Sequence, residues 1–88
     1  MEEAIELAFE SPGGIIDCRL EPVRDDDELY YSVTILYPAM VNGYNRSEIY
    51  CHTLRGDRAG GYFFEDGDDM LPKVRALEGL ITKAMAAL

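Results

Sequence analysis

The spacing of apolar residues changes once along the chain, and this change constrains the fold more than any other feature. Between residues 4 and 65 apolar residues recur mainly at every second position, whereas from Met70 onward they recur at spacings of three and four. A period of two is typical of a half-buried β-strand, and a period near 3.6 is typical of an amphipathic helix. The sequence therefore predicts an α+β fold in which several strands precede one C-terminal helix.

Alternating segments bounded by turn residues predict strands at about residues 4–10, 15–21, 29–37, 47–55 and 62–65. The connections between these strands are short. One is "PVRDDDE" at residues 22–28. The longest is "PAMVNGYNR" at residues 38–46, which we interpret as a loop with an Asn42-Gly43 turn. Short connections join antiparallel neighbours, so we expect a four- or five-stranded antiparallel meander. The pattern of the 47–55 strand leaves open which of its sides is buried.

The predicted helix, at about residues 70–87, has one apolar stripe that suits packing on one face of the sheet. The stripe comprises Met70, Val74, Leu77, Ile81, Ala84 and Leu88, with Met85 beside it. A chain of 88 residues is long enough for one hydrophobic core but short of the length at which chains divide into two domains. We therefore expect residues 1–88 to form a single α+β domain.

Acidic residues outnumber basic residues by 17 to 8, which gives a formal net charge of −9. Such a charge steers a protein toward cationic partners and away from phosphate backbones and anionic lipids. No stretch approaches the roughly 20 apolar residues of a membrane span, and the acidic start lacks the features of a secretory signal. We therefore expect a basic protein partner, with no direct binding of nucleic acid or membrane.

The two cysteines, Cys18 and Cys51, are too few for a disulfide scaffold and lack C-x-x-C spacing. Both lie within apolar strand patterns. We interpret them as reduced core residues of a cytoplasmic protein.

Two runs of acids stand out, one at residues 25–28 and one within "FFEDGDDMLP" at residues 63–72. In the second run, Asp68 or Asp69 suits an N-cap and Pro72 suits the first turn of the helix. Neither run fits a calcium loop, because Leu29 and Met70 stand where a fifth-position oxygen ligand is required. We therefore expect no metal and no cofactor, and we reserve Asp69 for capping. The remaining acids are candidate partner-binding residues: Asp25, Asp26, Asp27, Glu28, Glu65, Asp66 and Asp68.

The residues needed for catalysis are scarce. His52 is the only histidine, and its neighbour Cys51 projects to the opposite side of a strand, so the two cannot easily form a catalytic pair. The sequence also lacks the common nucleophile, zinc and phosphate-loop motifs. We therefore expect no enzyme, although a carboxylate near His52 within a pocket would support the rival hypothesis.

These observations favour a small acidic, non-enzymatic protein-binding domain. Dense carboxylates on an acidic body suit an inhibitor or nucleic-acid mimic that captures a basic, nucleic-acid-binding protein. The alternative is a structural homodimer that pairs through an aromatic open face of the sheet, in which the acids serve solubility only. Its face would comprise Tyr30, Leu36, Tyr50 and His52.

Overall fold

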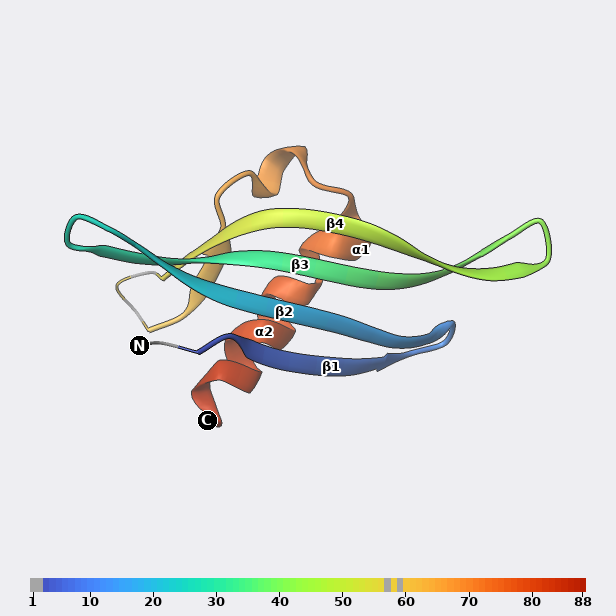
Figure 1. Ribbon diagram of the computed structural model, residues 1–88, viewed down its shortest axis with the longest axis horizontal. Helices are drawn as coiled ribbons and strands as arrows, with labels where there is room; N and C mark the ends of the chain where they lie inside the picture. Colours follow the sequence, from blue (N-terminus) through green and yellow to red (C-terminus); the bar gives the residue numbers. More distant parts are fainter. Residues whose placement is uncertain (1–2, 57, 59) are drawn as a thin grey trace.

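The computed structural model describes residues 3–56, 58 and 60–88, except for the side chains of residues 40 and 41. One antiparallel sheet precedes the helical segments, and its strand order follows the chain order (Figure 1). This architecture confirms the predicted meander with a C-terminal helix. The strands are β1 (Ile5–Ser11), β2 (Gly14–Asp25), β3 (Glu28–Val41), β4 (Tyr44–Gly56) and β5 (Tyr62–Phe64). The helical segments are η1 (Gly67–Asp69, a 3₁₀ turn), α1 (Pro72–Arg75) and α2 (Leu77–Ala86).

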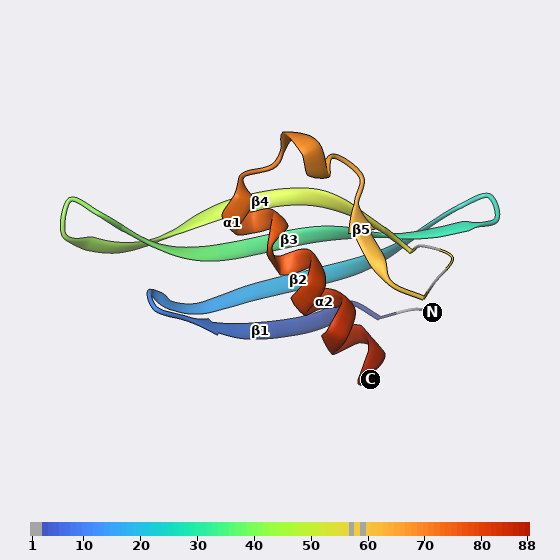
Figure 2. The ribbon, with the colours of Figure 1, turned by 180° about the vertical axis from the view of Figure 1, so that it is seen from behind.

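The sheet is curled, and α2 crosses one of its faces diagonally (Figure 2). The short strand β5 pairs with the end of β4 and lies on the same side of the sheet as α2. We call the side that carries α2 the covered face and the opposite side the open face. Figure 1 views the molecule from the open face, with β1 to β4 in front of the helix.

The hydrophobic core lies between the covered face and the helical segments. The strands contribute alternate residues to it, as the period of two predicts. Four residues of the predicted helical stripe are buried here, whereas Leu88 is 79% exposed and its assignment to the stripe is wrong. The buried core comprises Ile16, Cys18, Leu20, Val33, Ile35, Leu54, Phe64, Met70, Val74, Leu77 and Ile81.

The second, third and fourth strands are longer than predicted. Residues 22–28 and 38–46, expected as connections, continue β2, β3 and β4 to two short turns. Pro22 lies beyond the stretch of β2 that pairs with β1, and Pro38 lies beyond the stretch of β3 that pairs with β2. Proline is tolerated where a strand has a partner on one side only, so neither proline ends its strand. At roughly 3.3 Å per residue, the 14 residues of β3 alone account for the 47 Å long axis.

Both long hairpins turn through residues with positive φ. Asn42 and Gly43 have φ of 51° and 80°, which fits the two-residue turn that an Asn-Gly pair favours. The predicted Asn-Gly turn is therefore confirmed, although the surrounding loop is not. At the other end Asp26 has φ of 55°, a left-handed conformation that aspartate adopts more readily than most residues.

The helix begins differently from the prediction. Pro72 is the first residue of α1, as expected, but the N-cap residue is Leu71 and no side chain caps the helix. Asp68 and Asp69 belong to the preceding turn η1, so the assignment of either as an N-cap is wrong. The amides of Val74 and Arg75 bond to the Leu71 carbonyl instead. The helix is also interrupted at position 76, between α1 and α2.

Two polar side chains of α2 bond to the outer edge of β5. The amide of Phe64 donates to Glu78 Oε2 at 3.0 Å, and the amide of Tyr62 donates to Thr82 Oγ1 at 3.1 Å. The Thr82 hydroxyl in turn donates to the Tyr62 carbonyl at 3.3 Å. An edge strand otherwise presents unpaired backbone groups, so α2 closes this edge of the sheet.

In the part of the chain that the structure describes, no helix has the length and apolar character needed to cross a membrane.

Candidate functional site

The register of β3 with β4 decides which side of β4 faces the helix. Tyr50 lies opposite Ile35 and His52 lies opposite Val33, and both of these β3 residues are fully buried. Directly paired residues share a face of the sheet, so Tyr50 and His52 belong to the covered face. The sequence left this choice open because β4 is equally apolar on both sides.

The four residues expected to form a dimer face therefore do not share one face. Tyr30 and Leu36 lie on the open face, whereas Tyr50 and His52 lie on the covered face. The ring of Tyr50 packs edge-on against Tyr37, with Lys73 Nζ 5.6 Å from its centroid. The expectation of a common aromatic face is wrong, because the observed register directs Tyr50 and His52 toward the helix and leaves their neighbour Cys51 on the open face.

The two cysteines also lie on opposite faces. Cys18 is buried in the core, and burial together with the charge of Asp17 raises its pKa from 9.0 to about 11. Cys51 is exposed on the open face opposite Thr34. The interpretation of Cys51 as a core residue is therefore wrong. Both thiols are free.

The open face carries a high density of carboxylates. Side chains of directly paired residues project to the same side, so the register assigns each residue to a face. Among the described residues, its only cations are Arg19 and Arg55, which its acids clearly outnumber. The acids are Glu6 and Glu10 from β1, Asp17, Glu21 and Asp25 from β2, Glu28 from β3, and Glu65 after β5.

Arg55 joins the two acidic runs. Its guanidinium contacts Glu28 at 3.2 Å and Glu65 at 3.5 Å, and it lies 4.9 Å from the centroid of the Tyr30 ring. The two predicted partner-binding acids Glu28 and Glu65 are thus brought together at one end of the open face. Arg55 neutralises part of their charge, so the pair contributes less to the local field than two free carboxylates.

The acids at the turn between β2 and β3 remain free. Asp25, Asp26 and Asp27 are exposed, and no cation among the described residues forms an ion pair with them. We call residues 25–28 the acidic tip. It projects at one end of the long axis, at the end of the β2–β3 hairpin (Figure 1).

Asp66 and Asp68 lie elsewhere. Asp66 contacts His52 Nδ1 at 3.1 Å, and Asp68 contacts Arg75 at 3.4 Å. The segment that carries them lies beyond β4, on the far side of the sheet from β1 (Figure 1). The structure therefore separates these two acids from the acidic tip and from the acids of β1 and β2.

The contact between His52 and Asp66 provides the carboxylate that the enzyme hypothesis requires. The imidazole also packs edge-on against Phe64, with ring centroids 5.8 Å apart. A hollow of about 370 Å³ lies beside Asp66, but His52 does not line it. Cys51 faces the opposite side of β4, so it supplies no nucleophile to this pair. The contact joins β4 to the segment leading into η1.

Sequence reasoning did not assign Glu6, Glu10, Asp17 and Glu21 to a site. Each is an outward residue of a strictly alternating strand, so the pattern itself places these acids away from the core. What the pattern lacked was the register of β1 with β2, which sets Glu6 opposite Arg19. Arg19 contacts Glu6 at 2.8 Å and Glu21 at 3.0 Å, and these carboxylates raise its pKa.

Exposed apolar side chains accompany the acids at the other end of the open face. Ile15, Leu36 and Ile49 are 51%, 38% and 65% exposed. Leu36 lies opposite both Asp17 and Ile49 in the paired strands. An apolar patch beside charged residues is typical of surfaces that bind other proteins.

Within the described residues, no group of three or more His, Cys, Asp or Glu side chains is placed to hold a metal ion. Comparison with protein-family models, with curated proteins and with solved structures finds no match for this chain.

Proposed function

We propose that the protein is a non-enzymatic binding domain whose open face and acidic tip capture a basic, nucleic-acid-binding protein. In this role it would act as an inhibitor or nucleic-acid mimic, with carboxylates standing where phosphates would. The single observation that carries the proposal is the collection of acids from β1, β2 and the acidic tip on the open face. An acidic surface accelerates encounter with a cationic partner and rejects anionic ones.

The distribution of ion pairs also supports the open face and the acidic tip as the binding surface. Several cations already pair with carboxylates, including Arg55 with Glu28 and Lys73 with Glu48 at 2.7 Å. The Lys73 ammonium also lowers the pKa of Glu48. Among the described acids of the open face and the acidic tip, those without an ion pair are Glu10, Asp17, Asp25, Asp26 and Asp27. A cationic partner would therefore meet its strongest attraction there.

The homodimer is the less favoured alternative. Self-association through the open face would bring two copies of the same carboxylates together, and like charges in an interface oppose binding. Tyr50 and His52 are also not available on that face. The exposed Ile15, Leu36 and Ile49 would favour association, so the oligomeric state still separates the two hypotheses.

We also propose a cytoplasmic location. Cys18 and Cys51 are both free and lie on opposite faces of the sheet, so they cannot pair with each other within one chain. Labelling reduced thiols in intact cells would test this location for the exposed Cys51. Cys18 is buried, so its thiol is labelled after the protein has been unfolded. Recovery of oxidised Cys51 would count against the proposal.

The functional test compares two variants with the same loss of charge. The first replaces Asp25, Asp26 and Asp27 by Asn, which also suits the positive φ at position 26. The matched control replaces three acids that lie outside the strands and outside the acidic tip, by Glu3→Gln, Asp68→Asn and Asp69→Asn. Asp68 is 98% exposed, so breaking its pair with Arg75 should alter stability little.

Each variant is used to capture proteins from native lysate at low and at high salt, and duplex DNA is then added as a competitor. We expect the wild type and the control to capture a basic protein at low salt and to release it to DNA or salt. The tip variant should capture much less. Capture that resists both salt and DNA, or that falls equally in both variants, would contradict the proposal.

A further inference from the structure

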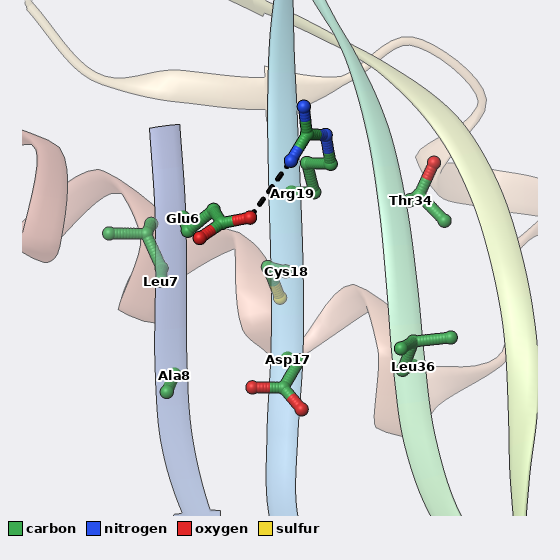
Figure 3. A pocket seen from close by; sticks show the side chains of 8 residues that line it. All are labelled: Glu6, Leu7, Ala8, Asp17, Cys18, Arg19, Thr34 and Leu36. Atoms are coloured by element: carbon green, nitrogen blue, oxygen red, sulfur yellow. Dashed lines mark hydrogen bonds and ion pairs between the residues drawn. The ribbon is translucent and has the colours of Figure 1, made fainter. Parts of the chain in front are cut away.

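The open face contains a groove between β1, β2 and β3, with a volume of about 490 Å³ (Figure 3). It exists because short side chains stand beside long ones. Ala8 and Thr34 are small, and the guanidinium of Arg19 turns aside to contact Glu6. The side chains of Leu7 and Cys18 point toward the core, so these residues line the groove through their backbone. The side chains that face the groove are those of Glu6, Ala8, Asp17, Arg19, Thr34 and Leu36.

The groove combines an apolar wall with a free carboxylate. Asp17 lies directly between Ala8 on β1 and Leu36 on β3, in one row across the strands. Its carboxylate points out of the sheet beside the Leu36 side chain (Figure 3). No ion pair joins Asp17 to any other residue in the described part of the chain. Both neighbours of Asp17 in this row are therefore apolar.

The charges around the groove favour a cation. The one guanidinium that lines it, Arg19, already contacts both Glu6 and Glu21, so it offers little attraction to an anion. Asp17 remains uncompensated, and the wider open face is acidic. A ligand that suits this arrangement has a positive end and an apolar stem, because the stem can cover Ala8 and Leu36 while the charge reaches Asp17.

We propose that the groove seats a lysine side chain of the basic partner, with its ammonium group at Asp17 and its methylene groups against Ala8 and Leu36. This inference rests on the proposed function, because it assumes that the partner approaches the open face. It adds a specific contact to an otherwise diffuse attraction. The groove volume falls within the range of ligand pockets, which leaves room for the side chain and the backbone that carries it.

The test separates stem length from charge. Short peptides of lysine and of 2,4-diaminobutyrate carry the same charges at slightly acidic pH, but each diaminobutyrate side chain lacks two methylene groups. Burying these two methylene groups should make the lysine peptide bind about three- to tenfold more tightly. Full burial would give a larger factor, but the groove is open and covers the side chain only in part. Isothermal titration calorimetry at low salt measures both affinities.

Two variants locate the effect. Leu36→Thr keeps a good strand former at an exposed position but removes the apolar wall, so the preference for lysine should fall to nearly one. Glu10→Gln removes a charge from the open face outside the groove. It should weaken both peptides about equally and leave their ratio unchanged.

The outcomes are distinct. A lysine preference that Leu36→Thr abolishes and Glu10→Gln preserves supports the groove. Equal affinity for the two peptides, or a preference that survives Leu36→Thr, overturns the groove while leaving charge-driven capture in place. Failure of both peptides to bind at low salt would overturn the proposed function itself.

Discussion

Replacing Thr82 by valine removes the hydroxyl that bonds to the edge of β5 and leaves the shape of the side chain nearly unchanged. The hydroxyl oxygen accepts from the Tyr62 amide at 3.1 Å, and the hydroxyl group donates to the Tyr62 carbonyl at 3.3 Å. Threonine and valine have similar helix propensities, so the change tests these two bonds and little else. Together with the Glu78 bond to the Phe64 amide, these bonds close the outer edge of β5, while the core residues Phe64, Leu77 and Ile81 pack β5 and α2 together.

The magnitude follows from the geometry. Each bond should contribute about 0.5–1.5 kcal/mol, and the 3.3 Å bond should lie at the lower end, so we expect a loss of roughly 1–2 kcal/mol. Urea unfolding gives the free energy of unfolding, with an unchanged m-value confirming that only stability has changed. Native-state hydrogen exchange should show faster exchange at the Tyr62 amide.

Thr82→Ser is the matched control, because it keeps the hydroxyl and removes only the methyl group. Its free energy of unfolding should lie closer to that of the wild type. If Thr82→Val is as stable as the wild type and the Tyr62 amide exchanges at the same rate, then the two Thr82 bonds do not hold this edge of β5 and the reasoning is refuted.

Three further predictions concern the rest of the fold. Ile81 is fully buried, so Ile81→Ala should lower the free energy of unfolding by about 2–5 kcal/mol, and a smaller loss in urea unfolding would mean a poorly packed core. Gly43 has φ of 80°, so Gly43→Ala should cost about 1 kcal/mol, whereas no change in thermal unfolding would count against the two-residue turn. The raised pKa of Cys18 means that the folded state favours the protonated thiol. The stability that this thiol contributes is full below about pH 9 and is lost as pH rises toward about 11. The loss should be of the order of 2 kcal/mol and absent in Cys18→Ala; identical pH profiles of the two proteins would refute it.

The elements were predictable because the hydrophobic period is clear. Alternation placed Ile16, Cys18 and Leu20 on one side of β2, and the structure buries all three. The three-four spacing likewise placed Leu77 and Ile81 in the core. These patterns depend only on the geometry of a strand or a helix, so they can be read from the sequence without knowing the neighbours.

The ends of the elements were less predictable. The predicted strands stop before Pro22 and Pro38, yet the strands continue through both prolines, because each lies where its strand has one partner, which only the pairing reveals. The acids before Pro72 suggested an N-cap, but the backbone forms the turn η1 there and keeps Asp68 and Asp69 out of capping position. Local propensity alone could not distinguish the observed strand ends and the turn η1 from the predicted strand ends and N-cap.

The candidate site was predicted only in part. The acidic tip is where the hairpin signal placed it, and its contact with Glu65 through Arg55 depends on the long-range pairing of β3, β4 and β5. The placement of Tyr50 and His52 on the covered face could not be deduced, since both sides of β4 are apolar and a shift of one residue exchanges them. The role of Glu6 and Asp17 required the register of β1 with β2.

Amide chemical shifts of the isotope-labelled protein, titrated with the captured basic protein at low salt, would locate the binding surface residue by residue. We expect the largest changes along β1 and β2 and at the acidic tip, with smaller changes in α2 and around Asp68. Changes concentrated on α1, α2 and η1, with the open face unaffected, would contradict the proposal that the open face captures the partner.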